Sequence, residues 1–298
     1  RYVRATEARM AEEPGDSNAF LWVDRLPEVR RQRLYSQLRR GQIAYEDLET
    51  REEGKRIKVP KGLIHHWVGV IFIPQTTLQQ TLAVMQDYDN HQNIYKPDVR
   101  RSKLLHRDGN DFKIYLQFYR KTIVTVVLNA EFDVRYFPVN ATRVHSRSYS
   151  TRIAELKNPD RPDEREKPVG KDRGFLWRLH TYWRFQEKDG GVYIQLESIG
   201  LSRGVPVLLR WPINPIIKRI RRESLFRLLK STRTALTNKS AAAARLPPQH
   251  NQTDRLGMDS PPPPSSTAPV DTGLSVRQLF PLHTTSASKT SSSAAYLR

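Results

Sequence analysis

A series of strand-like segments followed by one amphipathic helix fills residues 63–236, and this order restricts the possible folds more than any other feature. Apolar and polar residues alternate over 112–119 and again over 128–136, as in strands with one buried face. No helix predicted between the strands is long enough for a parallel crossover, so the sheet is expected to be antiparallel. Residues 216–236 carry apolar side chains at helical spacing. The pattern predicts an α+β fold, with a curved antiparallel sheet of six to seven strands wrapped around a long C-terminal helix.

The rest of the 298-residue chain divides on either side of this predicted domain. Residues 1–18 are polar and are expected to be a flexible N-terminus. Residues 19–62 predict a basic helix and a short strand, because Pro27 opens a helical pattern that Gly41 ends. Residues 237–298 are rich in Pro, Ser, Thr and Ala and predict a disordered tail.

Composition excludes several classes of function. The chain has no cysteine, which excludes disulfides, thiol catalysis and thiolate–metal sites. No apolar run reaches 18 residues, so no transmembrane helix is expected. The net charge is +19, and most of the excess lies in residues 63–235. This charge favours an anionic partner, such as lipid headgroups, a phosphate-bearing ligand or nucleic acid, unless it is only a solvated basic surface.

Large aromatic side chains occupy the apolar faces of several predicted strands. Trp177 and Trp183 share one face of the segment 175–187, and Phe118 and Phe132 lie on the apolar faces of two other strands. In the predicted architecture, the inner face of the sheet is both core and wall of a cavity beneath the helix. Cavities lined by apolar and aromatic groups usually bind small molecules, so these four residues are expected to contact a ligand.

One strand has two polar faces, and its orientation stays open. Arg147 and Tyr149 lie on one face together with His145, whereas serines occupy positions 146, 148 and 150 on the other. If Arg147 points inward, it needs an acidic partner or an anionic ligand, and Glu197 in the final strand is the candidate partner. If Arg147 points outward, both residues are solvated. The inward alternative makes Arg147, Tyr149 and Glu197 ligand-binding candidates.

The segment 206–215, PVLLRWPINP, is apolar and interrupted by proline. It is expected to cover the mouth of the cavity as a lid, with Leu209 and Trp211 as the lid residues. Basic residues follow at the start of the helix, and apolar residues beside a basic cluster can touch an anionic bilayer. The alternative is a packed loop followed by a solvated basic turn.

No metal or cofactor site is expected. His65 and His66 are adjacent in a strand and point to opposite faces, so they cannot easily bind the same ion. Asp87, Asp89 and His91 are spaced for a cation, but Asp at such positions more often caps a helix or a turn.

Catalytic signatures are equally lacking. The sequence shows no catalytic triad and no glycine-rich phosphate loop, and the acid–base candidates near the predicted cavity are His66, Arg147, Tyr149 and Glu197. The sequence therefore gives no reason to assign catalysis.

Four segments together resemble the helix-grip fold of the SRPBCC superfamily: IPQTTL, LAVMQDYDNHQNIYKPDVRRSKLL, LHTYWRFQEKDGGVYIQLESI and RRESLFRLLKSTRTAL. This superfamily includes START lipid-transfer domains, birch-pollen-allergen-like proteins and polyketide cyclases. The resemblance covers residues 63–236 and is closest to bacterial members described only as SRPBCC or START-like. It implies the fold well and the chemistry poorly.

Three functions of different classes follow. The leading hypothesis is non-enzymatic binding or transport of a hydrophobic small molecule or lipid in an internal cavity. The alternatives are an enzyme of the polyketide cyclase or aromatase type, and a basic protein that binds an anionic membrane or nucleic acid. Nucleic acid is the less expected partner because no recognised nucleic-acid module is present. The sequence begins with Arg1, which fits either a bacterial protein exported after loss of a signal peptide or a cytoplasmic one.

Overall fold

Seven long antiparallel strands and two short ones form one sheet in the computed structural model, which describes residues 1–12, 19–57, 59–121, 125–204 and 210–245. The side chains of residues 12, 210–218, 220, 221 and 240–245 lie outside the description, as does the C-terminal unit 248–298. Within the described residues, the strand order is β1-β4-β11-β10-β8-β7-β6-β5, with β9 paired to β8. The predicted antiparallel sheet is confirmed, and the two short strands β1 and β9 extend it beyond the expected seven.

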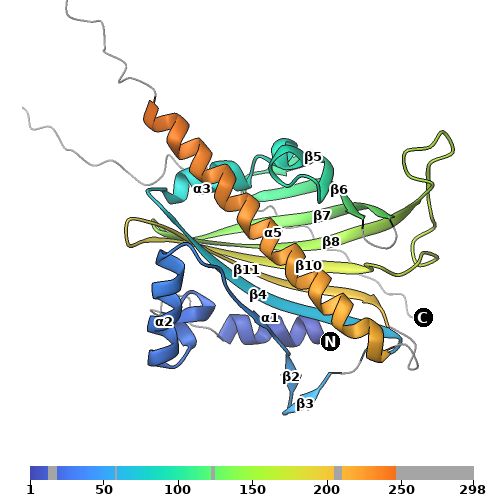
Figure 1. Cartoon of the computed structure of the whole chain (residues 1–298), viewed down its shortest axis with the longest axis horizontal. Helices are drawn as coiled ribbons and strands as arrows, with labels where there is room; N and C mark the ends of the chain where they lie inside the picture. Colours follow the sequence, from blue (N-terminus) through green and yellow to red (C-terminus); the bar gives the residue numbers. More distant parts are fainter. Residues whose placement is uncertain (13–18, 58, 122–124, 205–209, 246–298) are drawn as a thin grey trace, which may run out of the picture. The chain divides into compact units, whose positions relative to one another are not determined.

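The elements follow the predicted order along the chain (Figure 1). The helices and 3-10 turns are α1 (Tyr2–Glu12), η1 (Trp22–Arg25), α2 (Glu28–Arg39), α3 (Leu78–Met85), η2 (Tyr88–Asn90), α4 (His91–Ile94) and α5 (Arg210–Arg245). The strands are β1 (Ala44–Asp47), β2 (Arg51–Glu52), β3 (Lys55–Arg56), β4 (Gly62–Pro74), β5 (Val99–Asp108), β6 (Asp111–Lys121), β7 (Thr125–Asn140), β8 (Arg143–Lys157), β9 (Arg165–Glu166), β10 (Arg178–Lys188) and β11 (Gly191–Arg203).

Helix α5 crosses one face of the sheet, which we call the inner face (Figure 1). Leu225, Leu229 and Leu236 recur at helical spacing and are buried against this face. Gly69 of β4 lies beneath them, and a Cβ built on it would meet Leu229 Cδ1 at 2.7 Å. The glycine therefore allows the helix to approach the strand closely.

Helix α5 is longer than predicted at both ends. It begins at Arg210 rather than Ile216, so part of the proline-containing segment is helical. Pro212 falls in the first turn, where a backbone N–H has no helical acceptor to lose. Leu209 lies outside the described residues and so does the side chain of Trp211, so the lid stays a prediction.

The opposite, outer face of the sheet is covered by the N-terminal segment. Leu21 and Leu38 are fully buried against Val70, Phe72 and Tyr193, which belong to β4 and β11. Residues 1–12 also differ from the expected flexible N-terminus, because they form α1 with Tyr2 and Thr6 buried. The central strands thus have a packed layer on both sides.

The charged loop after β8 is attached to the sheet by one buried carboxylate. Glu155 has a fully buried side chain and accepts hydrogen bonds from Lys167 Nζ at 2.8 Å and Arg173 Nε at 2.5 Å. Burial opposes its ionisation, but these two cations hold the pKa of Glu155 below its ordinary value. No described helix is long and apolar enough to span a membrane.

Candidate functional site

Three of the predicted aromatic residues lie together on the inner face. Phe118 and Phe132 meet edge to face with ring centroids 6.1 Å apart, and Trp183 stacks on Phe185 at the same centroid distance. All of these residues belong to the apolar cluster that also contains Leu225 and Leu229 of α5. Phe118 and Trp183 are only partly buried, so aromatic surface stays accessible on the face that the helix crosses.

A strip of hydroxyl groups accompanies these rings. Strand pairing places Ser146 opposite Trp183, Ser148 opposite Thr181 and Ser150 opposite Phe132. Ser150 Oγ accepts a hydrogen bond from Leu179 N at 3.0 Å, but the buried Ser146 Oγ has no partner among the described residues. The inner face therefore combines apolar surface with a polar atom that is free to hydrogen-bond a bound molecule.

Trp177 is placed differently from the other aromatic candidates. It precedes β10, which begins at Arg178, and its backbone N donates to Leu201 O at 2.7 Å. Its indole N–H is buried and has no acceptor within the described part of the chain. Among the described residues, its ring is not part of the cluster around Trp183.

The polar candidates Arg147, Tyr149 and Glu197 are on the outer face, away from Phe118, Phe132 and Trp183. The serines of β8 point inward instead, since they alternate with His145, Arg147 and Tyr149 along the strand. The structure therefore does not bring all the predicted site residues into one site. The physical reason is that residues 1–12, expected to be flexible, instead form α1, which supplies acidic and basic partners for the outer set.

Helix α1 forms a buried polar network with that outer set. Glu197 accepts hydrogen bonds from Arg9 Nη2 at 2.5 Å and from His66 Nε2 at 2.7 Å, and Tyr2 OH lies 2.9 Å from His66 Nδ1. Burial opposes the charge on Glu197, but the His66 hydrogen bond and the Arg9 charge hold its pKa below the ordinary value. The network fixes α1 to the sheet and leaves no accessible carboxylate at Glu197.

Further residues of the outer face are also paired or desolvated. Tyr149 OH donates to Glu7 Oε1 at 2.5 Å, and burial followed by this contact raises the pKa of Tyr149 to about 12. His145 stacks on Phe137 with centroids 4.8 Å apart. Burial, together with the charges of Arg184 and Arg147, lowers the pKa of His145 to about 4. The Tyr149–Glu7 contact holds α1 against the sheet, and neither Tyr149 nor His145 belongs to the aromatic cluster of the inner face.

The inner face also carries two polar features, and His65 is the one residue of these that the sequence pattern singles out. By strand alternation, His65 and Ser202 share this face, and His65 Nε2 lies 2.9 Å from Ser202 Oγ. Glu155, neutralised by Lys167 and Arg173, is on the same face. The available signal for both was a polar residue within a local apolar run, which is LIHHW for His65 and IAEL for Glu155.

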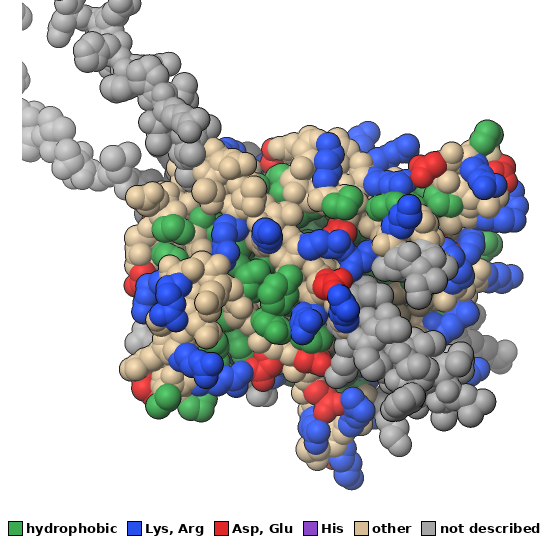
Figure 2. All heavy atoms as spheres, viewed as in Figure 1, with side chains coloured by type: hydrophobic (Ala, Val, Ile, Leu, Met, Phe, Trp, Pro, Cys, Tyr) green, Lys and Arg blue, Asp and Glu red, His purple; other side chains and the backbone are tan. Residues whose placement is uncertain are grey.

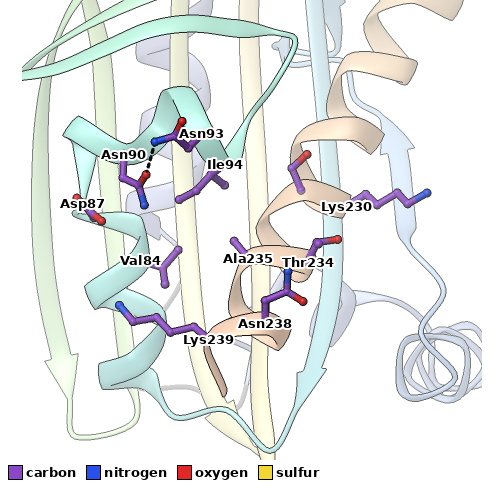
Figure 3. Close-up of a pocket in the computed structure, with 11 residues that line it drawn as sticks. Val84, Asp87, Asn90, Asn93, Ile94, Lys230, Thr234, Ala235, Asn238 and Lys239 are labelled. Atoms are coloured by element: carbon purple, nitrogen blue, oxygen red, sulfur yellow. Dashed lines mark hydrogen bonds between the residues drawn. The ribbon is translucent and has the colours of Figure 1, made fainter. Parts of the chain in front are cut away.

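The two acidic residues considered as cation ligands, Asp87 and Asp89, lie in different surroundings. Asp89 Oδ1 accepts a hydrogen bond from Leu104 N at 2.9 Å, which fixes the turn to β5. Asp87 borders a hollow between the α3–α4 segment and α5 (Figure 3). Within the described residues, no three His, Asp or Glu side chains are grouped so as to hold a metal ion.

His91 is buried between the rings of Tyr88 and Tyr95, with centroid distances of 4.8 and 5.1 Å. Burial lowers its pKa from 6.5 to about 4, although the Met85 carbonyl and the Asp87 charge act in the opposite direction. The neutral ring is thus favoured in the folded state, and the stability that it contributes is present above about pH 6.5 and lost as the pH falls through about 4.

We expect the free energy of unfolding to decrease by about 2–3 kcal/mol between about pH 7 and pH 4.5 because of His91. His91→Phe should remove this part of the pH dependence, while the part due to His145 persists. Urea denaturation at the two pH values measures the difference. His106→Phe, at an exposed position on β5, is the matched control. Equal pH dependence in the wild type and His91→Phe would contradict the assignment.

The arrangement has the helix-grip architecture that the sequence resemblance implies: an antiparallel sheet, short helices after its first long strand, and a long C-terminal helix across one face. The N-terminal segment on the outer face is an addition to that pattern. The fold class rests on the chain's own strand order and on the position of α5.

Several solved structures are similar to this chain. A protein from Thermus thermophilus has a TM-score of 0.43 and 13% identity, covering 58% of this chain and 97% of its own. A STAR-related lipid transfer protein fragment from Xanthomonas axonopodis has a TM-score of 0.42 and 16% identity, with coverages of 61% and 96%. The Zhui aromatase/cyclase from Streptomyces has a TM-score of 0.40 and 11% identity, with coverages of 61% and 97%. No protein-family model matches the sequence, and no curated protein matches it.

Proposed function

We propose that the protein binds a hydrophobic small molecule or lipid on the inner face of the sheet, beneath α5, and that it does so without catalysis. The observation that carries the proposal is the partly exposed aromatic surface of Phe118 and Trp183 beside the unpartnered Ser146 Oγ, which has no hydrogen bond to any described residue. Apolar ligands gain roughly 25 cal/mol per Å² of apolar surface buried, so contact with two large rings supports appreciable affinity.

Binding without catalysis is favoured over a cyclase-like activity by the position of the acid–base groups. His66, Arg147, Tyr149 and Glu197 lie on the outer face, where α1 supplies partners for three of them. On the inner face, the carboxylate of Glu155 is paired with two cations, which makes it a weak proton acceptor. A carrier needs no such group, because its ligand is held by apolar contact and a few hydrogen bonds.

A basic surface for membranes or nucleic acid has less support. Figure 2 shows Lys and Arg side chains spread over the visible face, with Asp and Glu among them. Several of these cations are paired, such as Arg227 with Asp98 and Arg120 with both Asp98 and Glu223. Scattered and paired cations give a weaker field than a single basic stripe.

Filling the inner face should block binding. Ser148 is 8% exposed, lies between Val134 and Thr181, and points toward the space beneath α5. We expect Ser148→Phe to weaken binding of a brominated fatty acid at least tenfold, which corresponds to about 1.4 kcal/mol. Quenching of tryptophan fluorescence by the bromine atoms measures the affinity, and native mass spectrometry of the purified protein detects ligand that copurifies.

Thr151→Phe is the matched control, because Thr151 lies on the same strand and is exposed. It should leave binding unchanged. Absence of saturable quenching in the wild type would contradict the proposal. So would unaltered affinity in a folded Ser148→Phe variant. Unfolding of this variant would also count against it, since that result means that protein side chains already fill the space.

A further inference from the structure

A hollow of about 470 Å³ separates the α3–α4 segment from the C-terminal half of α5 (Figure 3). Asp87 and Asn90 border it on the α3–α4 side, and Thr234 and Asn238 border it on α5. Its volume lies within the range of small-molecule sites, which is about 300–1,000 Å³. We call this hollow the α3–α5 groove.

The polar side chains of the groove are left without partners inside the protein. Among the described residues, the side chains of Asp87, Thr234, Asn238 and Lys239 make no hydrogen bond or ion pair. Only Asn90 and Asn93 are joined, by a bond of 2.8 Å from Nδ2 to Oδ1. This differs from the outer face, where the carboxylates of Glu7 and Glu197 both have partners. The groove therefore offers donors and acceptors that a ligand can use.

The two sides of the α3–α5 groove carry opposite charges. Asp87 follows α3, whereas Lys239 belongs to α5 and extends across the hollow toward α3 (Figure 3). Between the polar groups lies an apolar strip formed by Val84, Ile94 and Ala235. The carboxylate of Asp87 can pair with an ammonium group of a ligand, and the ammonium group of Lys239 can pair with an anionic group of the same ligand. The apolar strip between them fits a short apolar stem that joins the two ligand groups.

We infer that the α3–α5 groove binds such a zwitterion, with its ammonium group at Asp87 and its phosphate or carboxylate at Lys239. The amides of Asn90 and Asn238 supply further hydrogen bonds. The same chemistry occurs in a free small molecule and in the headgroup of a zwitterionic lipid, so the test must separate these two sources.

This site is independent of the proposed site on the inner face. Val84 forms part of the groove floor but is only 5% exposed and belongs to the core. Met85 and Leu236 are buried beside it and fill the interior on that side. A variant in the groove can therefore be examined while binding at the inner face is measured separately with the brominated fatty acid.

The test titrates the full chain with O-phosphoethanolamine by isothermal titration calorimetry. Asp87→Asn and Lys239→Gln should each weaken binding about tenfold, or about 1.4 kcal/mol. Lys157→Gln is the matched control, because Lys157 is an exposed lysine on β8 and is not among the residues that line the groove. It should leave the affinity unchanged. Circular dichroism checks that the variants fold.

Sedimentation with phosphatidylethanolamine vesicles, compared with phosphatidylglycerol vesicles, tests the lipid source with the same variants. Selective sedimentation that Asp87→Asn and Lys239→Gln abolish supports a headgroup site even without binding of the free compound. Absence of binding both in the calorimetric titration and in the vesicle sedimentation overturns the inference. Loss on Lys239→Gln alone, with Asp87→Asn unchanged, also overturns it, because that result describes an anion site. Fatty-acid binding should persist in every groove variant.

Discussion

Replacing Glu197 by alanine should decrease the free energy of unfolding by about 3–5 kcal/mol, since removing one partner of a buried pair leaves the other uncompensated. The side chains of Glu197 and His66 are 4% and 1% exposed, so water cannot replace the lost carboxylate. Arg9 loses the same partner and with it a contact that holds α1 on the sheet. Urea denaturation of the full chain measures the change.

Glu46→Ala is the comparison for this variant. Glu46 pairs with Arg30 at the surface, with Nη2 and an oxygen 2.6 Å apart, and an exposed pair of this kind contributes about 0–1 kcal/mol. Proteolysis of α1 should become faster in Glu197→Ala and not in Glu46→Ala. A cost for Glu197→Ala no greater than that for Glu46→Ala would show that the outer network does not stabilise the fold.

Gly69→Val should destabilise the protein by roughly 3 kcal/mol, because overpacking a filled core forces neighbouring atoms to move. A Cβ at this position would lie 2.7 Å from Leu229 Cδ1 and 3.1 Å from Leu225 Cδ2. Leu229 is fully buried, so its side chain has no free space to enter. The substitution therefore pushes α5 away from β4.

A second substitution tests this explanation. Leu229→Ala alone should cost about 2–5 kcal/mol by leaving a cavity. Combined with Gly69→Val, it provides the space that the valine needs, so the double variant should cost clearly less than the sum of the two single changes. Denaturation of the four proteins in parallel measures the coupling. Additive costs would mean that α5 and β4 are not in direct contact here.

Much of the fold could be predicted because strand alternation is a local property. The period of two placed Phe118 and Phe132 on one face without knowledge of the strand order. The length of α5 was harder to predict, because its last turns after Leu236 lack the apolar spacing that marks its central part.

The orientation of β8 could not be predicted from that strand alone. Both of its faces are polar over 145–150, and the residues that decide between them, Glu7 and Arg9, are more than 130 positions away in the chain. The α3–α5 groove could not be predicted for the same reason, since Asp87 and Lys239 are far apart in the sequence and border one hollow only in the folded chain. A usable signal existed in Leu63–Ile73, whose near-continuous apolar run is typical of a strand covered on both sides.

Strand β4 is covered by α5 on one face and by the N-terminal segment on the other, and this limits how the chain can be shortened. A fragment cut at residue 62 would retain every long strand and α5, yet would uncover Val70, Phe72 and Tyr193 as a contiguous apolar patch. It would also strip β1 from β4 and leave a row of unpaired amides and carbonyls along that edge. Such an edge beside an apolar patch is a template for self-association, so we expect the shortened chain to be less soluble than the full one.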